Sequence, residues 1–170
     1  MGEGPLAVRA LLVGNSTSLM GAGLGEYIDS FDTVVRFNGG NPSGNPEDLG
    51  GRTTYWSFST LNASDYERWR IPGAVPMCLN MRIDYPVFIS CAVHGDKETY
   101  QSLIDGLGHP RPSTGLITAN HISQHWECDL YAIGFDFFAN GTWYRGGNNN
   151  IPHNGDLEKQ YMKRLGVQIL

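Results

Sequence analysis

Residues 11–38 read LLVGNSTSLMGAGLGEYIDSFDTVVRFN and predict a strand, a polar loop, a helix and a second strand. The apolar run from Leu6 to Val13 ends at Gly14, which favours a strand buried in a parallel sheet and followed by a sharp turn. The segment from Thr33 to Asn38 is β-branched and aromatic, as is typical of a strand. Between them, apolar residues at helical spacing predict a crossover helix with Leu24, Tyr27, Ile28 and Phe31 on its buried face.

Polar side chains follow both of these predicted strands. Asn15, Ser16 and Thr17 come after the first strand, and Asn38 ends the second. Because parallel strands end at one edge of a sheet, and ligands of open α/β sheets bind at that edge, we expect Asn15 and Asn38 to meet in a binding site. The nearby glycines Gly21, Gly23 and Gly25 do not match the dinucleotide pattern Gly-x-Gly-x-x-Gly, so an NAD site is not expected.

The rest of the chain continues this alternation, which predicts an α/β fold with a mostly parallel sheet flanked by helices. A length of 170 residues predicts one domain covering residues 1–170. The predicted strands are Thr53–Ser59, Val75–Leu79, Val87–Val93, Leu130–Phe138 and Val167–Leu170. The predicted helices are Ala63–Arg70, Asp96–Leu107, one beginning after Ser113, and Asp156–Leu165, and the segment Gly39–Arg52 is expected to be a long surface loop.

The start of the helix after Ser113 is a candidate anion site. Pro110 and Pro112 hold the preceding chain extended, and Ser113 can cap the helix. Thr114 and Gly115 would then present free backbone N–H groups, which bind phosphate well.

Composition excludes several classes of function. The formal net charge is −5, which argues against a nucleic-acid-binding surface. There is no apolar run approaching the roughly 20 residues of a membrane helix and no signal-peptide pattern, so the chain as written is expected to be soluble and cytoplasmic.

The cysteines and histidines give no clear metal site. Cys78, Cys91 and Cys128 are widely separated and odd in number, which favours reduced core thiols over a zinc site or a disulfide framework. His121 and His125 are spaced to share one helix face and are a possible metal pair, but no third ligand is evident, and solvated helix residues are the favoured interpretation.

Three stretches, in order, resemble motifs of one enzyme family. Residues 13–40, VGNSTSLMGAGLGEYIDSFDTVVRFNGG, followed by DLGGRTTYW at 48–56, resemble the long sialylmotif of the glycosyltransferase family 29 sialyltransferases. Residues 109–137, HPRPSTGLITANHISQHWECDLYAIGFDF, resemble the short sialylmotif, and HNGDLE at 153–158 resembles the very short motif. The resemblance implies a variant Rossmann-like, GT-A-like nucleotide-binding fold.

The resemblance also implies a reaction and a set of residues. The family transfers sialic acid from a CMP-activated donor to a glycan acceptor with inversion and without a metal or other cofactor. His153 would be the catalytic base, and Glu158 corresponds to the acidic residue of the very short motif. The donor site would be lined by Asn15, Ser16, Asn38, Ser113, Thr114, Gly115, Gly134 and Phe135.

The sequence also departs from the family pattern. The motif histidine that stabilises the departing phosphate is missing from residues 142–145, TWYR, where Tyr144 or Arg145 is expected to substitute. Ala10 stands where the animal enzymes have a disulfide cysteine, which leaves Cys128 without that partner. The family's membrane anchor is also missing, so a Golgi location is expected only if an anchor has been removed.

Three alternatives remain open at the level of sequence. One is transfer of another CMP-activated acid such as Kdo, and another is a catalytically silent CMP-binding relative. A third is a truncated module whose acceptor site lies on a missing segment or a partner.

Overall fold

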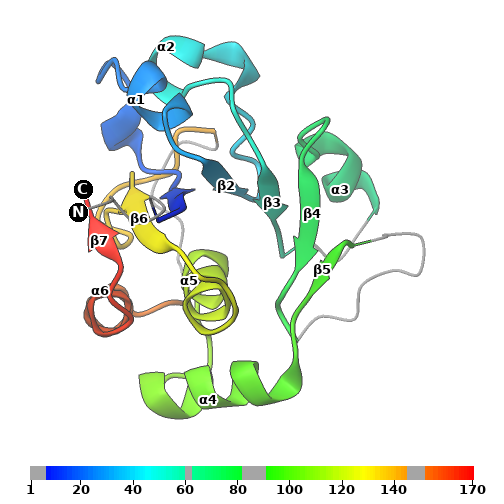
Figure 1. Cartoon of the computed structure of the whole chain (residues 1–170), viewed down its shortest axis with the longest axis vertical. Coiled ribbons are helices and arrows are strands. Elements are labelled where there is room, and N and C mark those ends of the chain that lie inside the picture. The colour runs from blue at the N-terminus through cyan, green and yellow to red at the C-terminus, as the bar shows by residue number, and fades with distance from the viewer. Residues whose placement is uncertain (1–6, 60–62, 82–90, 145–151) are drawn as a thin grey trace, which may run out of the picture.

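The computed structural model describes residues 7–59, 63–81, 91–144 and 152–170 and contains one seven-stranded sheet (Figure 1). The strand order is β5-β4-β3-β2-β1-β6-β7, and every neighbouring pair is parallel. The strands are β1 (Arg9–Val13), β2 (Thr33–Phe37), β3 (Tyr55–Ser57), β4 (Val75–Cys78), β5 (Val93–His94), β6 (Asp129–Ile133) and β7 (Gln168–Ile169). The prediction of a mostly parallel α/β sheet is confirmed.

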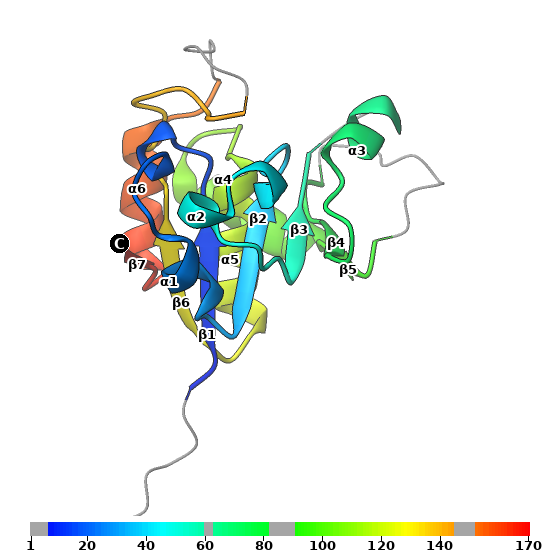
Figure 2. The ribbon, with the colours of Figure 1, turned by 90° about the horizontal axis from the view of Figure 1, so that it is seen from above.

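Helices cover both faces of the sheet, as the two ribbon views show (Figures 1 and 2). One face carries α1 (Gly25–Asp29) and α2 (Pro46–Leu49), and the segment containing α3 (Ala63–Trp69) extends this layer beside β3 and β4. The other face carries α4 (Lys97–Leu107), α5 (Thr114–His125) and α6 (Gly155–Arg164). Within the described residues, no helix has both the length and the hydropathy needed to cross a bilayer.

Strand β1 is apolar at nearly every position because both of its faces are buried. Ala10 and Leu12 pack into the core beneath α4, α5 and α6, whereas Leu11 and Val13 pack into the core beneath α1. All four side chains are at most 2% exposed. A strand covered on both faces has no solvent-facing position, so its sequence does not alternate.

A third, smaller core lies beneath α3 and corrects the expectation for the cysteines. Trp56 and Phe58 stack there with ring centroids 4.3 Å apart. Cys78 and Cys91 join as a disulfide in this core, with Cα atoms 5.9 Å apart, so the prediction of three reduced thiols was wrong for this pair. The two cysteines meet because β5 runs alongside β4. Cys128 is free, as expected.

The predicted strand Leu130–Phe138 is too long, because β6 ends at Ile133. The backbone at Gly134, Phe137 and Phe138 has positive φ angles of 69°, 54° and 71°, a conformation that no strand contains. The chain therefore leaves the sheet at Gly134 and forms a loop over its edge.

The segment Gly39–Arg52 is also more structured than predicted. It contains a one-turn 3₁₀ helix and α2, and Leu49 is only 1% exposed. Asp48 accepts backbone hydrogen bonds from Gly21 at 2.7 Å and Gly23 at 2.9 Å, which ties this segment to the loop before α1. The other helices and strands differ from the predicted ones mainly at their ends. The crossover helix α1 is short, with five residues. Most of the predicted strand Val87–Val93 lies outside the described residues.

The strand order places a crevice at β1. The chain adds β2 to β5 on one side of β1, and β6 and β7 on the other side. The direction in which strands are added thus reverses at β1, so the loops that follow β1 and β6 leave to opposite sides. Ligands of open α/β sheets bind in the crevice between such loops.

Candidate active site

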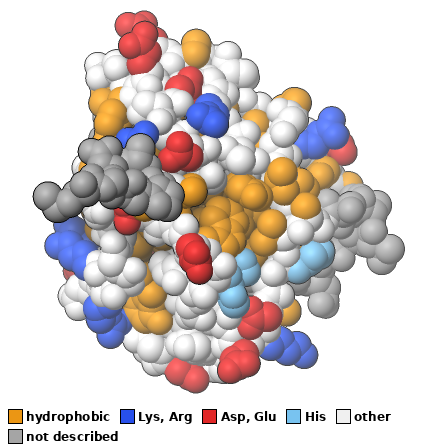
Figure 3. Space-filling model, viewed as in Figure 1, with side chains coloured by type: hydrophobic (Ala, Val, Ile, Leu, Met, Phe, Trp, Pro, Cys, Tyr) orange, Lys and Arg blue, Asp and Glu red, His pale blue; other side chains and the backbone are white. Residues whose placement is uncertain are grey.

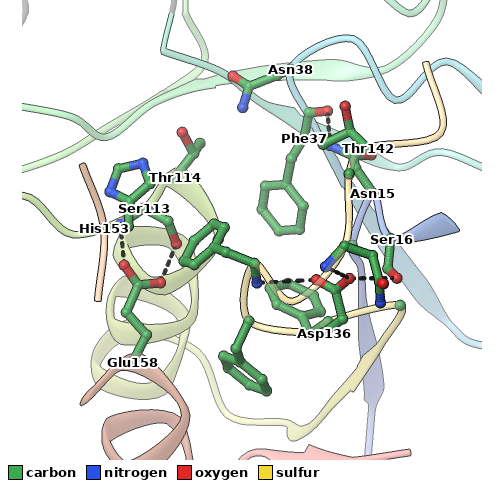
Figure 4. A pocket seen from close by; sticks show the side chains of 18 of the residues that line it. Asn15, Ser16, Phe37, Asn38, Ser113, Thr114, Asp136, Thr142, His153 and Glu158 are labelled. Atoms are coloured by element: carbon green, nitrogen blue, oxygen red, sulfur yellow. Dashed lines mark hydrogen bonds between the residues drawn. The ribbon is translucent and has the colours of Figure 1, made fainter. Parts of the chain in front are cut away.

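A cavity of about 370 Å³ opens at the carboxyl ends of β1, β2 and β6, between those loops and the first turns of α5 and α6 (Figure 4). Eleven of the twelve predicted site residues line it: Asn15, Ser16, Asn38, Ser113, Thr114, Gly115, Gly134, Phe135, Tyr144, His153 and Glu158. The twelfth, Arg145, lies outside the described residues. Residues from three distant parts of the sequence are thus brought to one cavity.

The two asparagines meet at the edge of the sheet, as predicted. Asn15 Nδ2 donates to the backbone carbonyl of Phe37 at 3.1 Å, which joins the ends of β1 and β2. Asn38 has a positive φ of 49°, and its Oδ1 accepts a hydrogen bond from the Ser59 N–H at 3.0 Å. Because Oδ1 is engaged in this way, the amide nitrogen of Asn38 is left to face the cavity (Figure 4).

The first turn of α5 forms another wall of the cavity. Ser113 is the N-cap, and its Oγ accepts a hydrogen bond from Leu116 N–H at 3.2 Å. The Thr114 hydroxyl donates to Ser59 Oγ at 2.9 Å, which links the helix start to the loop after β3. The N–H groups of Thr114 and Gly115 have no partner within the helix, because they belong to its first turn. This end of α5 is therefore suited to a phosphate.

The close approach of α5 to the loop after β6 requires glycine at position 115. A Cβ on Gly115 would lie 2.7 Å from Cε1 of Phe135, well inside van der Waals contact. The Phe135 ring fills the space between α5 and β2, where it packs edge-on against Phe37 at 5.8 Å. The close contact between α5 and Phe135 is thus possible only because Gly115 has no side chain.

Glu158 is buried in the first turn of α6 and bonds to the cap of α5. Its side chain is 3% exposed, and Oε1 accepts a hydrogen bond from Ser113 N–H at 2.8 Å. Oε2 accepts a second hydrogen bond from the Ser113 hydroxyl. Burial raises the pKa of Glu158 from 4.5 to about 7, and the two hydrogen bonds from Ser113 oppose that shift.

His153 lines the cavity and faces the loop after β6. Its Nδ1 is 2.8 Å from the backbone carbonyl of Arg111, which can only accept, so Nδ1 carries the proton. The neutral ring then has its lone pair on Nε2. Burial lowers the pKa of His153 below its usual 6.5, so the neutral form is favoured at neutral pH. The Phe138 ring packs against it with centroids 5.2 Å apart.

Asp136 was not among the predicted site residues, and it organises the loop after β6. Its Oδ2 accepts hydrogen bonds from the Ser16 hydroxyl at 3.1 Å and the Asn140 N–H at 2.9 Å, and Oδ1 accepts one from Phe138 N–H at 3.1 Å. Ser16 is therefore turned toward Asp136. An acidic residue two positions after a strand-ending glycine, Gly134, was the available signal.

Residues 142–144 cross the cavity beside β1. Thr142 pairs with Ser16 in an antiparallel bridge, and Trp143 N–H donates to the Asn15 carbonyl at 3.0 Å. The Tyr144 ring lies over Gly39, where a Cβ would come within 2.7 Å of it. Tyr144 thus presents an aromatic wall near the ends of β1 and β2.

Comparison with solved structures identifies the fold. The chain superposes on the crystal structure of a mammalian sialyltransferase with a TM-score of 0.69, at 20% identity, covering 96% of this chain and 69% of that chain. A second structure, of a mammalian sialyltransferase in complex with Gal-beta-1-3GalNAc-ortho-nitrophenol, gives a TM-score of 0.66 at 19% identity and the same coverage.

Comparison of sequences identifies the relatives. Human CMP-N-acetylneuraminate-beta-galactosamide-alpha-2,3-sialyltransferase 1 is 27% identical over 187 residues, which cover 89% of this chain and 51% of the relative. Human type 2 lactosamine alpha-2,3-sialyltransferase is 42% identical over 50 residues, covering 29% of this chain and 15% of the relative. The chain spans about half the length of the first of these relatives.

A family model locates the resemblance at the start of the sheet. Residues 7–74 match the model described as glycosyltransferase family 29 (sialyltransferase). This region contains β1 to β3 and the two asparagines at the cavity. The family model, the relatives and the fold thus agree: the chain is similar to glycosyltransferase family 29, the sialyltransferases, in the sequence of residues 7–74 and in its fold.

Proposed function

We propose that this chain transfers sialic acid, or a related ulosonic acid, from a CMP-activated donor to a sugar hydroxyl with inversion. The observation that carries the proposal is the 2.8 Å distance between Nδ1 of His153 and the Arg111 carbonyl. Because that carbonyl can only accept, we infer that Nδ1 carries the proton and that Nε2 can accept a proton at the cavity. A neutral imidazole with a depressed pKa is ready to act as a general base near neutral pH.

In the proposed reaction, Nε2 of His153 takes the proton of the acceptor hydroxyl as its oxygen attacks the anomeric carbon of the donor. The bond from that carbon to the phosphate oxygen of CMP breaks, and the electron pair leaves with the phosphate. The first-turn N–H groups of α5 and the Asn38 amide nitrogen are the groups placed to stabilise this negative charge.

We assign Glu158 a positioning role in this reaction. Its carboxylate bonds to both the N–H and the hydroxyl of Ser113, the cap of α5. By fixing Ser113, Glu158 sets the direction in which the first turn of α5 faces the cavity. Tyr144 is the described residue that we propose in place of the missing motif histidine, because it lines the same cavity.

The proposed reaction needs no metal. The described carboxylates at the cavity are already engaged: Asp136 bonds to its own loop and to Ser16, and Glu158 bonds to Ser113. Neutral and partly positive groups, the helix N–H groups and amides, remain to face the leaving phosphate. We expect turnover to be unchanged by EDTA.

The proposed acceptor is a galactose-terminated glycan. Two similar proteins support this choice: the human relative is a beta-galactosamide-alpha-2,3-sialyltransferase, and one sialyltransferase of similar fold was solved in complex with Gal-beta-1-3GalNAc-ortho-nitrophenol. The missing motif histidine is the feature that favours the alternative of a catalytically silent CMP-binding relative. Kdo as the transferred acid is a second alternative, since the missing motif histidine affects the donor end of the site.

The disulfide supports an oxidising compartment for this activity. Disulfides such as Cys78–Cys91 persist in secreted and lumenal proteins and are rare in the cytosol. We therefore propose that the chain works in a secretory lumen or outside the cell, in place of the cytoplasmic location expected at first.

The test measures CMP release from CMP-Neu5Ac with and without galactose-terminated acceptors. His153→Asn retains an N–H for the Arg111 carbonyl but lacks the basic nitrogen, so turnover should fall by about 100-fold or more while CMP affinity stays within about threefold. His94→Ala, at an exposed histidine on β5, is the matched control and should leave turnover unchanged.

Other results of the CMP-release test would change or reject the proposal. Normal turnover in His153→Asn would remove His153 as the base. CMP binding without release from CMP-Neu5Ac, followed by release from CMP-Kdo, would change the donor. CMP binding without release from either donor would favour the silent module, and no CMP binding would reject the proposal.

A further inference from the structure

A second cluster of polar side chains lies at the opposite end of α5 from the cavity. His121 and His125 lie one turn apart on α5, with ring centroids 4.6 Å apart. Asp96, which caps α4, faces them, and its Oδ2 is 3.5 Å from Nε2 of His125. One ligand atom from each of the three residues lies within 4.8 Å of the other two. The sequence showed the two histidines but not the third residue.

His121 is the member of this cluster whose bonding is incomplete. Its side chain is buried at 8% exposure, and its Nδ1 is enclosed with no hydrogen-bond partner in the described part of the chain. A cavity of about 10 Å³ lies beside it, lined in part by Asp96, Thr99 and Asn120. A buried ring nitrogen without a partner costs free energy unless something binds it.

We propose that Asp96, His121 and His125 bind one divalent cation of the zinc type. Two imidazole nitrogens and one carboxylate oxygen are a set of ligands that zinc prefers. In a tetrahedral site with bonds of about 2.1 Å, ligand atoms lie about 3.4 Å apart. The spacing of up to 4.8 Å therefore closes with a small rotation of these side chains, and a water would complete the coordination.

The neighbouring hydrogen bonds permit that closure. Asp96 uses Oδ1 to cap α4 through Thr99 N–H at 2.7 Å, which leaves Oδ2 for the cation. His125 Nε2 now lies 3.0 Å from the Thr99 hydroxyl. If the cation takes Nε2, that hydroxyl keeps a second partner, Gln124 Oε1, at 3.3 Å. No capping bond has to break.

The position of the cluster indicates what the cation would do. Helix α5 has 12 residues and is thus about 18 Å long, so the cluster and the donor cavity are at opposite ends of it. The cation would join the start of α4 to the end of α5, and it would not take part in the transfer reaction. Asp96 and His125 are exposed, so a cation can reach the cluster from solvent. Figure 3 shows histidine and acidic side chains on the molecular surface of this face.

The experiment titrates the untagged chain with Zn²⁺ by calorimetry and with Co²⁺ by visible absorption. Asp96→Asn keeps a capping residue, because Asn caps helices as well as Asp does, and it removes only the charged ligand. His125→Gln changes the more exposed histidine, which lowers the risk of misfolding. His94→Gln is the matched control, a histidine outside the cluster.

We expect one equivalent of Zn²⁺ to bind, with a tetrahedral Co²⁺ spectrum and a melting temperature that rises with Zn²⁺ concentration. Both cluster variants should weaken binding at least tenfold, and the control should match the unchanged chain. The proposal would be overturned if Zn²⁺ showed no saturable binding, or if Asp96→Asn and His125→Gln bound Zn²⁺ as tightly as the unchanged chain. Asp96 and His125 would then be a polar contact without a cation.

Discussion

Glu158 and Ser113 are 45 residues apart in sequence, and the buried carboxylate of Glu158 accepts hydrogen bonds from both the backbone N–H and the hydroxyl of Ser113. This contact joins α6 to the first turn of α5, across one side of the candidate active-site cavity. It places a titratable group with a pKa of about 7 directly behind the helix start that is proposed to hold the phosphate.

Glu158→Gln should make stability less dependent on pH. Because the pKa of Glu158 rises from 4.5 to about 7 on folding, the folded state holds more protons than the unfolded state between these values. The chain therefore loses stability as the pH rises from about 4.5 through 7, by up to about 3 kcal/mol. The neutral variant avoids this loss, so its stability relative to the unchanged chain should improve between pH 5 and pH 8, as measured by urea unfolding.

Glu98→Gln is the matched control for that measurement, because Glu98 also lies in the first turn of a helix but is exposed. It should leave the pH dependence unchanged. A Glu158→Gln curve parallel to that of the unchanged chain would contradict the raised pKa of the buried Glu158.

The pH profile of transfer should have its acid limb below pH 6.5. Burial lowers the pKa of His153, so the base stays neutral and competent at pH values where an exposed histidine is largely protonated. The measurement is kcat/KM for CMP release as a function of pH, since this ratio reports the free enzyme. An acid limb above pH 6.5 would show that another group limits the reaction or that His153 is solvated.

Gly115→Ala should disturb the donor site and the fold together. The added Cβ meets the Phe135 ring at 2.7 Å, so either the ring or the helix start has to move. We expect a loss of about 1–3 kcal/mol in unfolding free energy, as is usual for overpacking, and a weaker affinity for CMP. Urea unfolding and CMP calorimetry measure the two effects.

Gly44→Ala serves as the control for this substitution, because a Cβ there meets nothing within 4 Å and the residue has no positive φ. Its stability should stay within about 0.5 kcal/mol of the unchanged chain. If Gly115→Ala behaved in the same way, the tight approach of α5 to Phe135 would be wrong.

Reduction of the Cys78–Cys91 disulfide should destabilise the chain by about 3 kcal/mol. The bond closes a loop with a sequence separation of 13, and loops of this size lose roughly that much when opened. Urea unfolding with and without a phosphine reductant measures the effect. Cys128→Ser should remain as sensitive as the unchanged chain, because Cys128 is free. Equal stability in both conditions would mean that the two thiols are not joined.

The sequence predicted the asparagine pair at the sheet edge because the evidence was local. Apolar runs ending in Asn15 and Asn38 indicated two buried parallel strands, and parallel strands end together. The cap at Ser113 was predicted for the same reason, since a polar residue before an apolar helix is a local signal.

The features that were missed depend on distant segments or unusual backbone. Cys78 and Cys91 meet only because β4 and β5 pair, and Asp96 reaches His125 only because α4 packs on α5. The loop organised by Asp136 contains Phe138 in a left-handed conformation that phenylalanine rarely adopts, so residue type gave no indication of it.

Every strand pair in the sheet is parallel, so every strand leaves the sheet at the same rim. Most residues that line the candidate cavity lie at or after the ends of strands or in the first turns of helices, whereas the strand interiors pack the three cores. Recognition and folding thus depend on largely separate sets of positions. Loops at this rim can therefore be lengthened or replaced, and the ligand bound there changed, while the sheet beneath keeps its packing and its strand order.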